Sequence, residues 1–105
     1  MCDHDYLFNL NMEKVKQDTL EIITKNNLTV LGSYFHLFEN KSFTGVIALS
    51  ESHVAMHTWP ELGVVNIDVY TCNYSRDNAE NTRKTFDEIS AIFKPQKIIK
   101  QEIRR

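Results

Sequence analysis

Three side chains in the middle of this 105-residue chain are of types that carry out covalent and proton-transfer chemistry: Ser52, His57 and Cys72. A serine hydroxyl can attack a carbonyl, and an imidazole, with a pKa near neutrality, can act as a general base. Ser52 lies in a polar break, Ser50-Glu51-Ser52, between two apolar runs. Taken singly, Ser52 fits a turn and Cys72 a buried structural thiol. The surrounding sequence decides between these interpretations.

A metal site formed by His53, His57 and Cys72 is an alternative chemical interpretation. Histidines at positions i and i+4 chelate well on a helix, but residues 53–59 are predicted to form a strand. On a strand, side chains four positions apart are too distant to share one ion. The spacing therefore favours proton transfer, and we predict no metal.

The elements that carry these residues are predicted from apolar periodicity and turn residues. We expect six strands, at residues 5–10, 28–38, 43–49, 53–59, 64–72 and 97–103. We expect two helices, at residues 12–25, with Asn11 as N-cap, and at residues 77–93, ended by Pro95. This order predicts an α+β fold, an antiparallel β-sheet with two helices packed on one face.

The two central strands predict sheet faces of different character, because successive side chains point to opposite faces. One face is apolar and suits packing under the helices: Val54, Met56, Val65, Ile67 and Val69. The other face is rich in polar and reactive groups: His53, His57, Trp59, Asn66, Asp68, Tyr70 and Cys72. The second face is therefore the expected location of chemistry.

Length and charge limit the classes of function. A chain of this length is expected to form one domain, residues 1–105, and such small domains often dimerise to cover an apolar face. A formal net charge of −2 gives no general attraction to nucleic acid or to an anionic membrane. No signal peptide or membrane-spanning run is evident, so we expect a cytoplasmic protein that acts on a small molecule.

The run from Thr44 to Glu61, TGVIALSESHVAMHTWPE, resembles the processing site of S-adenosylmethionine decarboxylases of the short prokaryotic type. Residues 67–72, IDVYTC, and 35–38, FHLF, resemble the segments that follow and precede that site in the family. The strong similarity covers about residues 33–73. The combination of Glu-Ser-His, His-Thr-Trp-Pro-Glu and Thr-Cys in this order is specific, although a motif is a hypothesis until its structural context is known.

The resemblance implies self-cleavage between Glu51 and Ser52. The Ser52 hydroxyl would attack the Glu51 carbonyl to form an ester, and elimination would release a β chain, residues 1–51. Hydrolysis, with loss of ammonia, would then leave an α chain, residues 52–105, that begins with a pyruvoyl group derived from Ser52. The resemblance also implies that His57 is the base of the elimination and that Thr44 supports processing in place of the usual serine. Cys72 would return a proton to the substrate after carbon dioxide has left.

The resemblance further implies a substrate pocket with Glu61, with Phe38 as a candidate to stack on adenine and Trp59 as a further contact. For Phe38 and Trp59, a core or dimer-contact role is an open alternative. The implied assembly is a homodimer of αβ units with active sites near the interface. Departures such as Leu62-Gly63-Val64-Val65 after the Trp-Pro-Glu run concern the pocket wall, so decarboxylation of arginine or ornithine is an alternative, as is an inactive regulatory paralogue.

Overall fold

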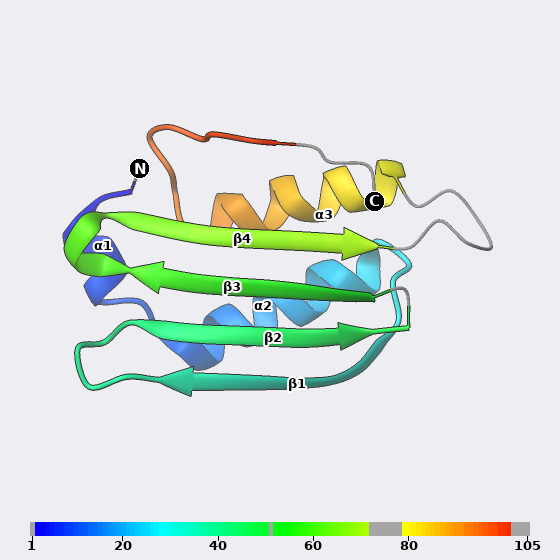
Figure 1. The fold of residues 1–105 in the computed structure, drawn as a ribbon, viewed down its shortest axis with the longest axis horizontal. Helices are drawn as coiled ribbons and strands as arrows, with labels where there is room; N and C mark the ends of the chain where they lie inside the picture. Colours follow the sequence, from blue (N-terminus) through cyan, green and yellow to red (C-terminus); the bar gives the residue numbers. More distant parts are fainter. Residues whose placement is uncertain (1, 51, 72–78, 102–105) are drawn as a thin grey trace.

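The computed structural model describes residues 2–50, 52–71 and 79–101. Its sheet has four antiparallel strands in the order β1-β2-β3-β4, so each strand pairs with its neighbour in sequence (Figure 1). The strands are β1 (Val30–Leu37), β2 (Phe43–Leu49), β3 (Ser52–Trp59) and β4 (Val64–Thr71). The helices are α1 (His4–Phe8), α2 (Met12–Lys25) and α3 (Ala79–Ile92), and the 3₁₀ turn η1 (Pro60–Leu62) joins β3 to β4.

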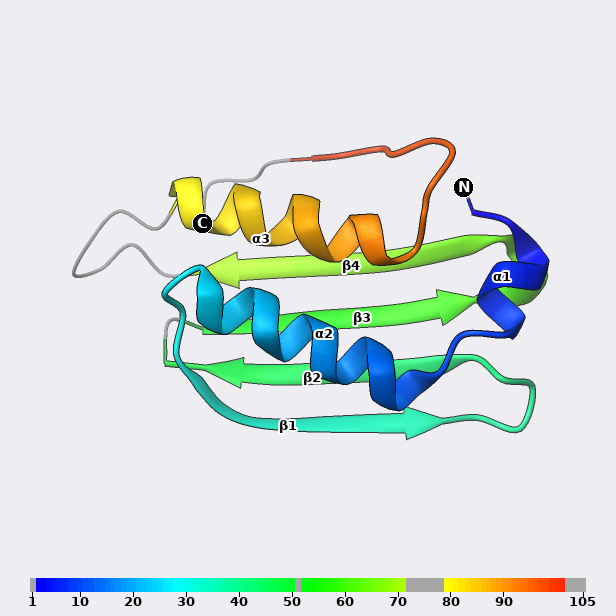
Figure 2. The same ribbon diagram turned by 180° about the vertical axis from the view of Figure 1, so that it is seen from behind.

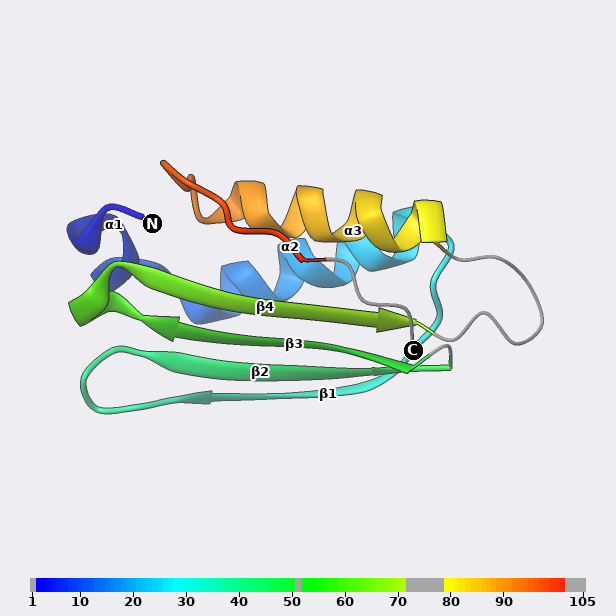
Figure 3. The same cartoon turned by 45° about the horizontal axis from the view of Figure 1, so that its top comes forward.

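Helices α2 and α3 lie side by side over one face of the sheet (Figures 2 and 3). The core lies between these two layers. From the sheet it contains Phe43, Ile47 and Val54, and from the helices Val15, Ile23 and Ile89, all at most 2% exposed. Val65, Ile67 and Val69 are partly buried against the same core. The predicted α+β architecture and the predicted apolar face are therefore confirmed.

The ends of α2 show why this helix forms where the sequence predicts it. The Asn11 side chain caps its start by accepting a hydrogen bond from Lys14 N at 3.2 Å. Asn26 follows its last turn, and the Asn26 side chain donates to Thr85 Oγ1 at 3.1 Å and to Glu88 Oε1 at 2.8 Å on α3. Lys25 also pairs with Glu88. The end of α2 is thereby joined to α3.

The strand predicted at residues 5–10 is wrong, because this segment contains α1 instead. Asp3 caps the short helix by accepting from Tyr6 N at 3.0 Å, and Asn9 follows its last residue. Tyr6 donates its hydroxyl proton to the Ile92 carbonyl at 2.7 Å, while Leu7 is buried. Capping residues on both sides of a five-residue segment favour a helical turn over an extended strand.

The strand predicted at residues 97–103 is wrong over residues 97–101, which form no strand and lie across a cavity from β4. Lys100 draws this segment toward α3. Its Nζ atom lies 3.0 Å from Asp87 Oδ1 and 5.4 Å from the centroid of the Phe86 ring. Side-chain contacts to the helix therefore replace strand pairing. Residues 102–103 lie outside the described residues.

The face of the sheet opposite the helices has no covering layer among the described residues (Figure 1). We call it the open face. Several large side chains on or beside it are exposed: Tyr34 at 65%, Val46 at 45%, Phe38 at 42% and Trp59 at 37%. This is the face that the sequence pattern assigns to His53, His57 and Asp68.

Candidate functional site

Strand β3 carries Ser52 at its first residue and His57 five residues later, and the register places them at opposite ends of the sheet. Ser52 pairs with Leu49 of β2 and Thr71 of β4, whereas His57 pairs with Thr44 and Asn66. Five residues of an extended strand span about 16 Å. We call these two regions the Ser52 end and the His57 end. In one chain they are too far apart for His57 to reach Ser52.

At the His57 end, the structure brings together the two residues that the sequence assigned to processing. Thr44 Oγ1 lies 2.7 Å from His57 Nδ1, a short hydrogen bond between adjacent strands. Thr44 and His57 are directly opposed in the β2–β3 ladder, so the backbone register itself produces the contact. In the tautomer whose Nδ1–H donates to Thr44, the His57 Nε2 atom keeps a lone pair that can accept a proton.

Aromatic rings surround His57 on the open face. The Trp59 ring centroid lies 4.3 Å from that of His57, and the Phe38 centroid lies 6.3 Å away. His36 packs edge-on against Phe38 at 4.6 Å. Phe38 and Trp59, both predicted to contact substrate, therefore lie close to the imidazole. Their exposed ring surface is suited to stacking on a flat or cationic ligand.

Glu61, the third residue predicted to contact substrate, lies in η1 directly after Trp59 and Pro60, and it is exposed. Gly63 ends this turn with a left-handed φ of 64°. Its carbonyl accepts a hydrogen bond from Cys2 N at 2.7 Å, which joins the N-terminal segment to the turn. Cys2 itself is buried, and this burial raises the pKa of its thiol, which makes it a poor nucleophile. Among the described residues, Glu61 therefore lies in a turn of defined conformation at the His57 end.

At the Ser52 end, Ser52 has a φ of 154°, a backbone conformation that residues other than glycine rarely adopt. The Ser52 Oγ atom lies 3.1 Å from Nδ1 of the next residue, His53. Ser52 is the first residue of β3 and follows the turn after β2. Ser52 is half-buried, and its backbone is strained at the point where β3 begins.

The Ser52 end also has a contact that the sequence reasoning missed. His53 Nε2 lies 3.4 Å from Asp68 Oδ2 on β4, and the Tyr70 ring packs edge-on against His53 at 5.7 Å. Strand alternation placed His53, Asp68 and Tyr70 on one face, but it could not show that they meet. The β3–β4 register decides this, because it pairs His53 with Tyr70 and Ala55 with Asp68.

Two assigned residues, Glu51 and Cys72, lie outside the described residues. Their described neighbours in sequence, Ser52 and Thr71, are paired with each other at the ends of β3 and β4. As for the metal alternative, the described residues contain no group of three or more histidine, cysteine or acidic side chains arranged to hold an ion. His53 and His57 belong to separate clusters at the two ends of the sheet.

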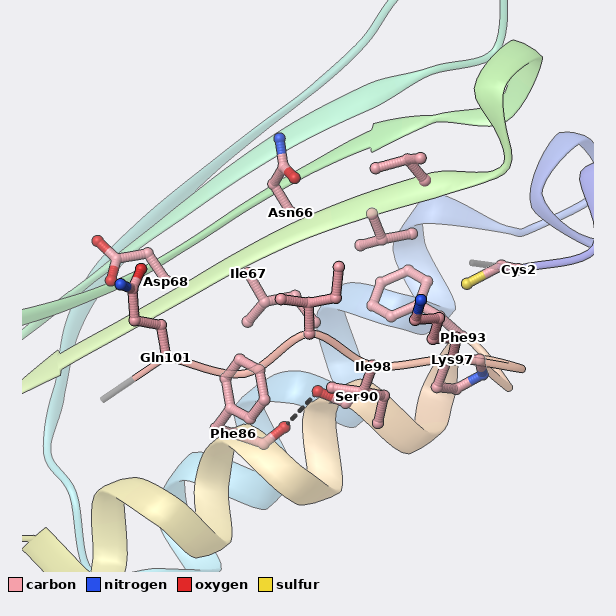
Figure 4. A pocket seen from close by; sticks show the side chains of 14 residues that line it. Cys2, Asn66, Ile67, Asp68, Phe86, Ser90, Phe93, Lys97, Ile98 and Gln101 are labelled. Atoms are coloured by element: carbon pink, nitrogen blue, oxygen red, sulfur yellow. Dashed lines mark hydrogen bonds between the residues drawn. The ribbon is translucent and has the colours of Figure 1, made fainter. Parts of the chain in front are cut away.

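A cavity of about 520 Å³ lies between β4, α3 and residues 95–101, and Asp68 is the one described residue of the Ser52 end that lines it (Figure 4). Its lining includes Phe86, Ser90, Phe93 and Ile98, and Ser90 donates to the Phe86 carbonyl at 2.7 Å. Neither the His57 end nor Ser52 lines it. We therefore place the chemistry on the open face, where the reactive groups are, and not in this cavity. Within the described ranges, no helix has the length and apolar content needed to cross a bilayer.

Comparison with known proteins identifies the family of this chain. The family profile described as S-adenosylmethionine decarboxylase matches residues 1–105. The S-adenosylmethionine decarboxylase proenzyme of Pyrococcus horikoshii is 36% identical over 104 residues, which cover 99% of this chain and 70% of that protein. The proenzyme of a Sulfurihydrogenibium species is 42% identical over 88 residues, covering 84% of this chain and 63% of that protein.

A solved structure shares the fold as well. The crystal structure of the adenosylmethionine decarboxylase from Aquifex aeolicus superposes with a TM-score of 0.75 at 26% identity, covering 99% of this chain and 88% of that one. The relatives are not described as arginine or ornithine decarboxylases. By full-length profile match, by sequence identity and by fold, this chain belongs to the S-adenosylmethionine decarboxylase family.

Proposed function

We propose that this chain is a self-processing S-adenosylmethionine decarboxylase whose pyruvoyl group forms from Ser52, and that two copies of the chain share each site. The observation that carries the proposal is the 2.7 Å contact between Thr44 Oγ1 and His57 Nδ1 on the open face. The contact unites two residues that the family motif assigns to processing. It lies on the strand that begins at Ser52.

The fold around Ser52 suits cleavage before this residue. The bond to be broken lies between β2 and β3, and the ladder from Leu49–Ser52 to Thr44–His57 pairs the two strands on either side of it. The β chain, residues 1–51, and the α chain, residues 52–105, would therefore remain joined by strand pairing and by the common core. The pyruvoyl group would lie at the first residue of β3.

A pyruvoyl group supplies the carbonyl that takes up the electron pair left by departing carbon dioxide, a task that no ordinary side chain performs. In forming it, His57 accepts the proton removed in the elimination step, through Nε2. Thr44 orients the imidazole ring through its contact with Nδ1. Cys72 returns a proton to the substrate after decarboxylation.

The sharing of a site follows from the separation of its parts. Ser52 and His57 of one chain are about 16 Å apart along β3. A two-fold axis that packs two open faces together, with the strands reversed, brings the Ser52 end of one copy to the His57 end of the other. Such an interface is self-complementary, so it forms two equivalent sites. The second copy therefore supplies His57 to each Ser52.

The exposed side chains of the open face support this assembly. Tyr34, Phe38, Val46 and Trp59 expose between 37% and 65% of their surface there. Contiguous exposed apolar and aromatic surface marks an interaction site. A second copy would cover part of it and leave Phe38, Trp59 and Glu61 to form the wall of the substrate site.

The first test is the intact mass of the purified chain under denaturing conditions. We expect two chains, divided at residue 51, with no free amino group on the second. Ser52→Ala should remain one chain, because it has no hydroxyl to attack with, while Ser50→Ala should be cut normally. Carbon dioxide should be released from S-adenosylmethionine and not from arginine or ornithine. A wild-type chain that stays uncut after long incubation would refute the proposal.

The shared site is tested by mixing two inactive variants. Ser52→Ala and His57→Ala chains, each uncut alone, are refolded together with different affinity tags. In a mixed pair, the intact His57 of the first faces the intact Ser52 of the second. With random pairing, we expect about half of the His57→Ala chains, and none of the Ser52→Ala chains, to be cut. Absence of any cleavage in the mixture would show that Ser52 and His57 act within one chain.

A further inference from the structure

Ser52, His53 and Asp68 form a continuous chain of polar contacts at the Ser52 end. Ser52 Oγ lies 3.1 Å from His53 Nδ1, and His53 Nε2 lies 3.4 Å from Asp68 Oδ2. None of these contacts involves His57. The first step of processing, attack of the Ser52 hydroxyl on the Glu51 carbonyl, needs a base at Ser52, and the imidazole that contacts the Ser52 hydroxyl is that of His53.

The two partners of His53 fix which nitrogen can act. An ionised carboxylate only accepts hydrogen bonds, so Asp68 requires the proton of His53 to be on Nε2. The Nδ1 atom then carries the lone pair and accepts the Ser52 hydroxyl proton. Serine, histidine and aspartate have the same relationship in hydrolase triads, although there the roles of the two nitrogens are exchanged. The edge-on Tyr70 ring packs against His53 from the paired position on β4.

We propose that His53, oriented by Asp68, is the base of the first processing step, and that His57 serves only the later elimination. The Ser52 oxygen forms a bond to the Glu51 carbonyl carbon, and His53 Nδ1 takes the hydroxyl proton. The peptide C–N bond then breaks, and Nδ1 gives that proton to the departing amide nitrogen of Ser52. The product is an ester and a free amine, with no net gain or loss of protons. This inference rests on the proposed self-processing.

The two histidines are separated by trapping the ester with hydroxylamine, which cleaves esters and leaves peptide bonds intact. In the His57→Ala background the ester should accumulate, so hydroxylamine should divide the chain at residue 51. In the double variant His53→Ala, His57→Ala, we expect ester formation to slow about 100-fold or more, the contribution typical of a general base. Added imidazole should restore part of that rate in the double variant and leave the single variant unchanged.

His53→Gln covers the case in which the alanine variant does not fold, because glutamine keeps the size and hydrogen-bonding capacity without the basicity. It should fold and form the ester as slowly as the alanine variant. Ester formation at the His57→Ala rate in a folded His53 variant would overturn the inference and leave the proposed function intact. An uncut wild-type chain would instead overturn the proposed function.

Asp68 acts through His53 and is therefore a positioning residue. In the His57→Ala background, Asp68→Asn should slow ester formation about tenfold, while Asp18→Asn, a surface carboxylate paired with Lys14, should have no effect. Added to a His53→Ala chain, Asp68→Asn should cause no further loss, because its effect passes through the imidazole. An equal loss in both backgrounds would show that Asp68 has only a structural role.

Discussion

The two ends of the open face are organised by different kinds of contact. At the His57 end, one short hydrogen bond to Thr44 and the rings of Trp59 and Phe38 hold an imidazole beside exposed aromatic surface. At the Ser52 end, a line of polar groups leads from a strained serine to a carboxylate on β4. The first arrangement suits substrate recognition and elimination, and the second suits activation of a nucleophile.

The comparison shows that neither end of one chain is a complete site. Ser52, the residue to be converted, lies away from the His57 end, and the exposed rings of Phe38 and Trp59 lie away from the Ser52 end. A single extended strand, β3, carries the key residue of each end, and its length keeps them apart. Under the proposed assembly, we expect the chemistry to be divided between successive steps and between two copies of the chain.

The largest expected effect is that of replacing Cys72, which should separate self-cleavage from decarboxylation. We expect Cys72→Ala to be cut like the wild type but to lose most product formation, because the thiol is needed only after carbon dioxide has left. Cys72→Ser should also be poor, since a hydroxyl is a much weaker acid than a thiol of pKa about 8.5. The assays are intact mass for cleavage and carbon dioxide release with product analysis for turnover. If Cys72→Ala kept full turnover and did not lose activity during the reaction, another group would be the donor of the proton that the substrate receives after decarboxylation.

Thr44→Val breaks the organising contact of the His57 end while keeping the size of the side chain. Without its hydroxyl partner, His57 loses the contact that orients its ring, and we expect elimination to slow about tenfold or more with accumulation of the ester. Thr44→Ser, which keeps the hydroxyl, is the matched control and should process at least as fast as the wild type. Intact mass measured over time, with and without hydroxylamine treatment, follows ester accumulation and cleavage in both variants. Equal processing rates in the valine and serine variants would contradict the role given to Thr44.

Gly63→Ala tests whether the turn after Trp59 positions the substrate wall. A Cβ atom at residue 63 would lie 2.7 Å from the Cys2 carbonyl oxygen and from the His4 ring, and φ is 64°. We expect a loss of about 1–2 kcal/mol of stability, as for other non-glycine residues in this conformation. Because Glu61 would shift with the turn, KM for S-adenosylmethionine should rise more than kcat falls, while cleavage stays normal. Thermal unfolding and steady-state kinetics measure these effects. An unchanged KM would show that η1 does not position the substrate.

The smallest expected effect concerns the helix layer, away from the reactive groups of the open face. Hydrogen bonds from Lys25 and Asn26 lower the pKa of Glu88. A carboxyl group whose pKa is lowered by folding stabilises the folded state at pH values above the ordinary pKa of the group. This stabilisation is lost as the pH falls through the lowered pKa. Glu88→Gln should therefore cost less than about 1 kcal/mol near neutral pH, since the pair is partly exposed. Denaturant titrations should show the difference disappearing as pH falls below the ordinary value of 4.5.

Part of the fold could be predicted because its signals are local. Asn11 and the apolar stripe of residues 12–25 define α2, and alternation in residues 53–59 and 64–71 defines the two faces of β3 and β4. The two wrong strands, at residues 5–10 and 97–101, were decided by contacts outside the segment or by its caps: Asp3 and Tyr6 in the first, and Lys100 with Asp87 in the second.

The sequence by itself determined the family motif, the residue types at Ser52 and His57, and the face on which His57 lies, because side-chain alternation along a strand needs no partner. Only the tertiary structure decided which of these groups meet. The β2–β3 register places Thr44 against His57, and the β3–β4 register brings Asp68 to His53. Register depends on pairing across strands, and the length of β3 then keeps Ser52 from the His57 of its own chain.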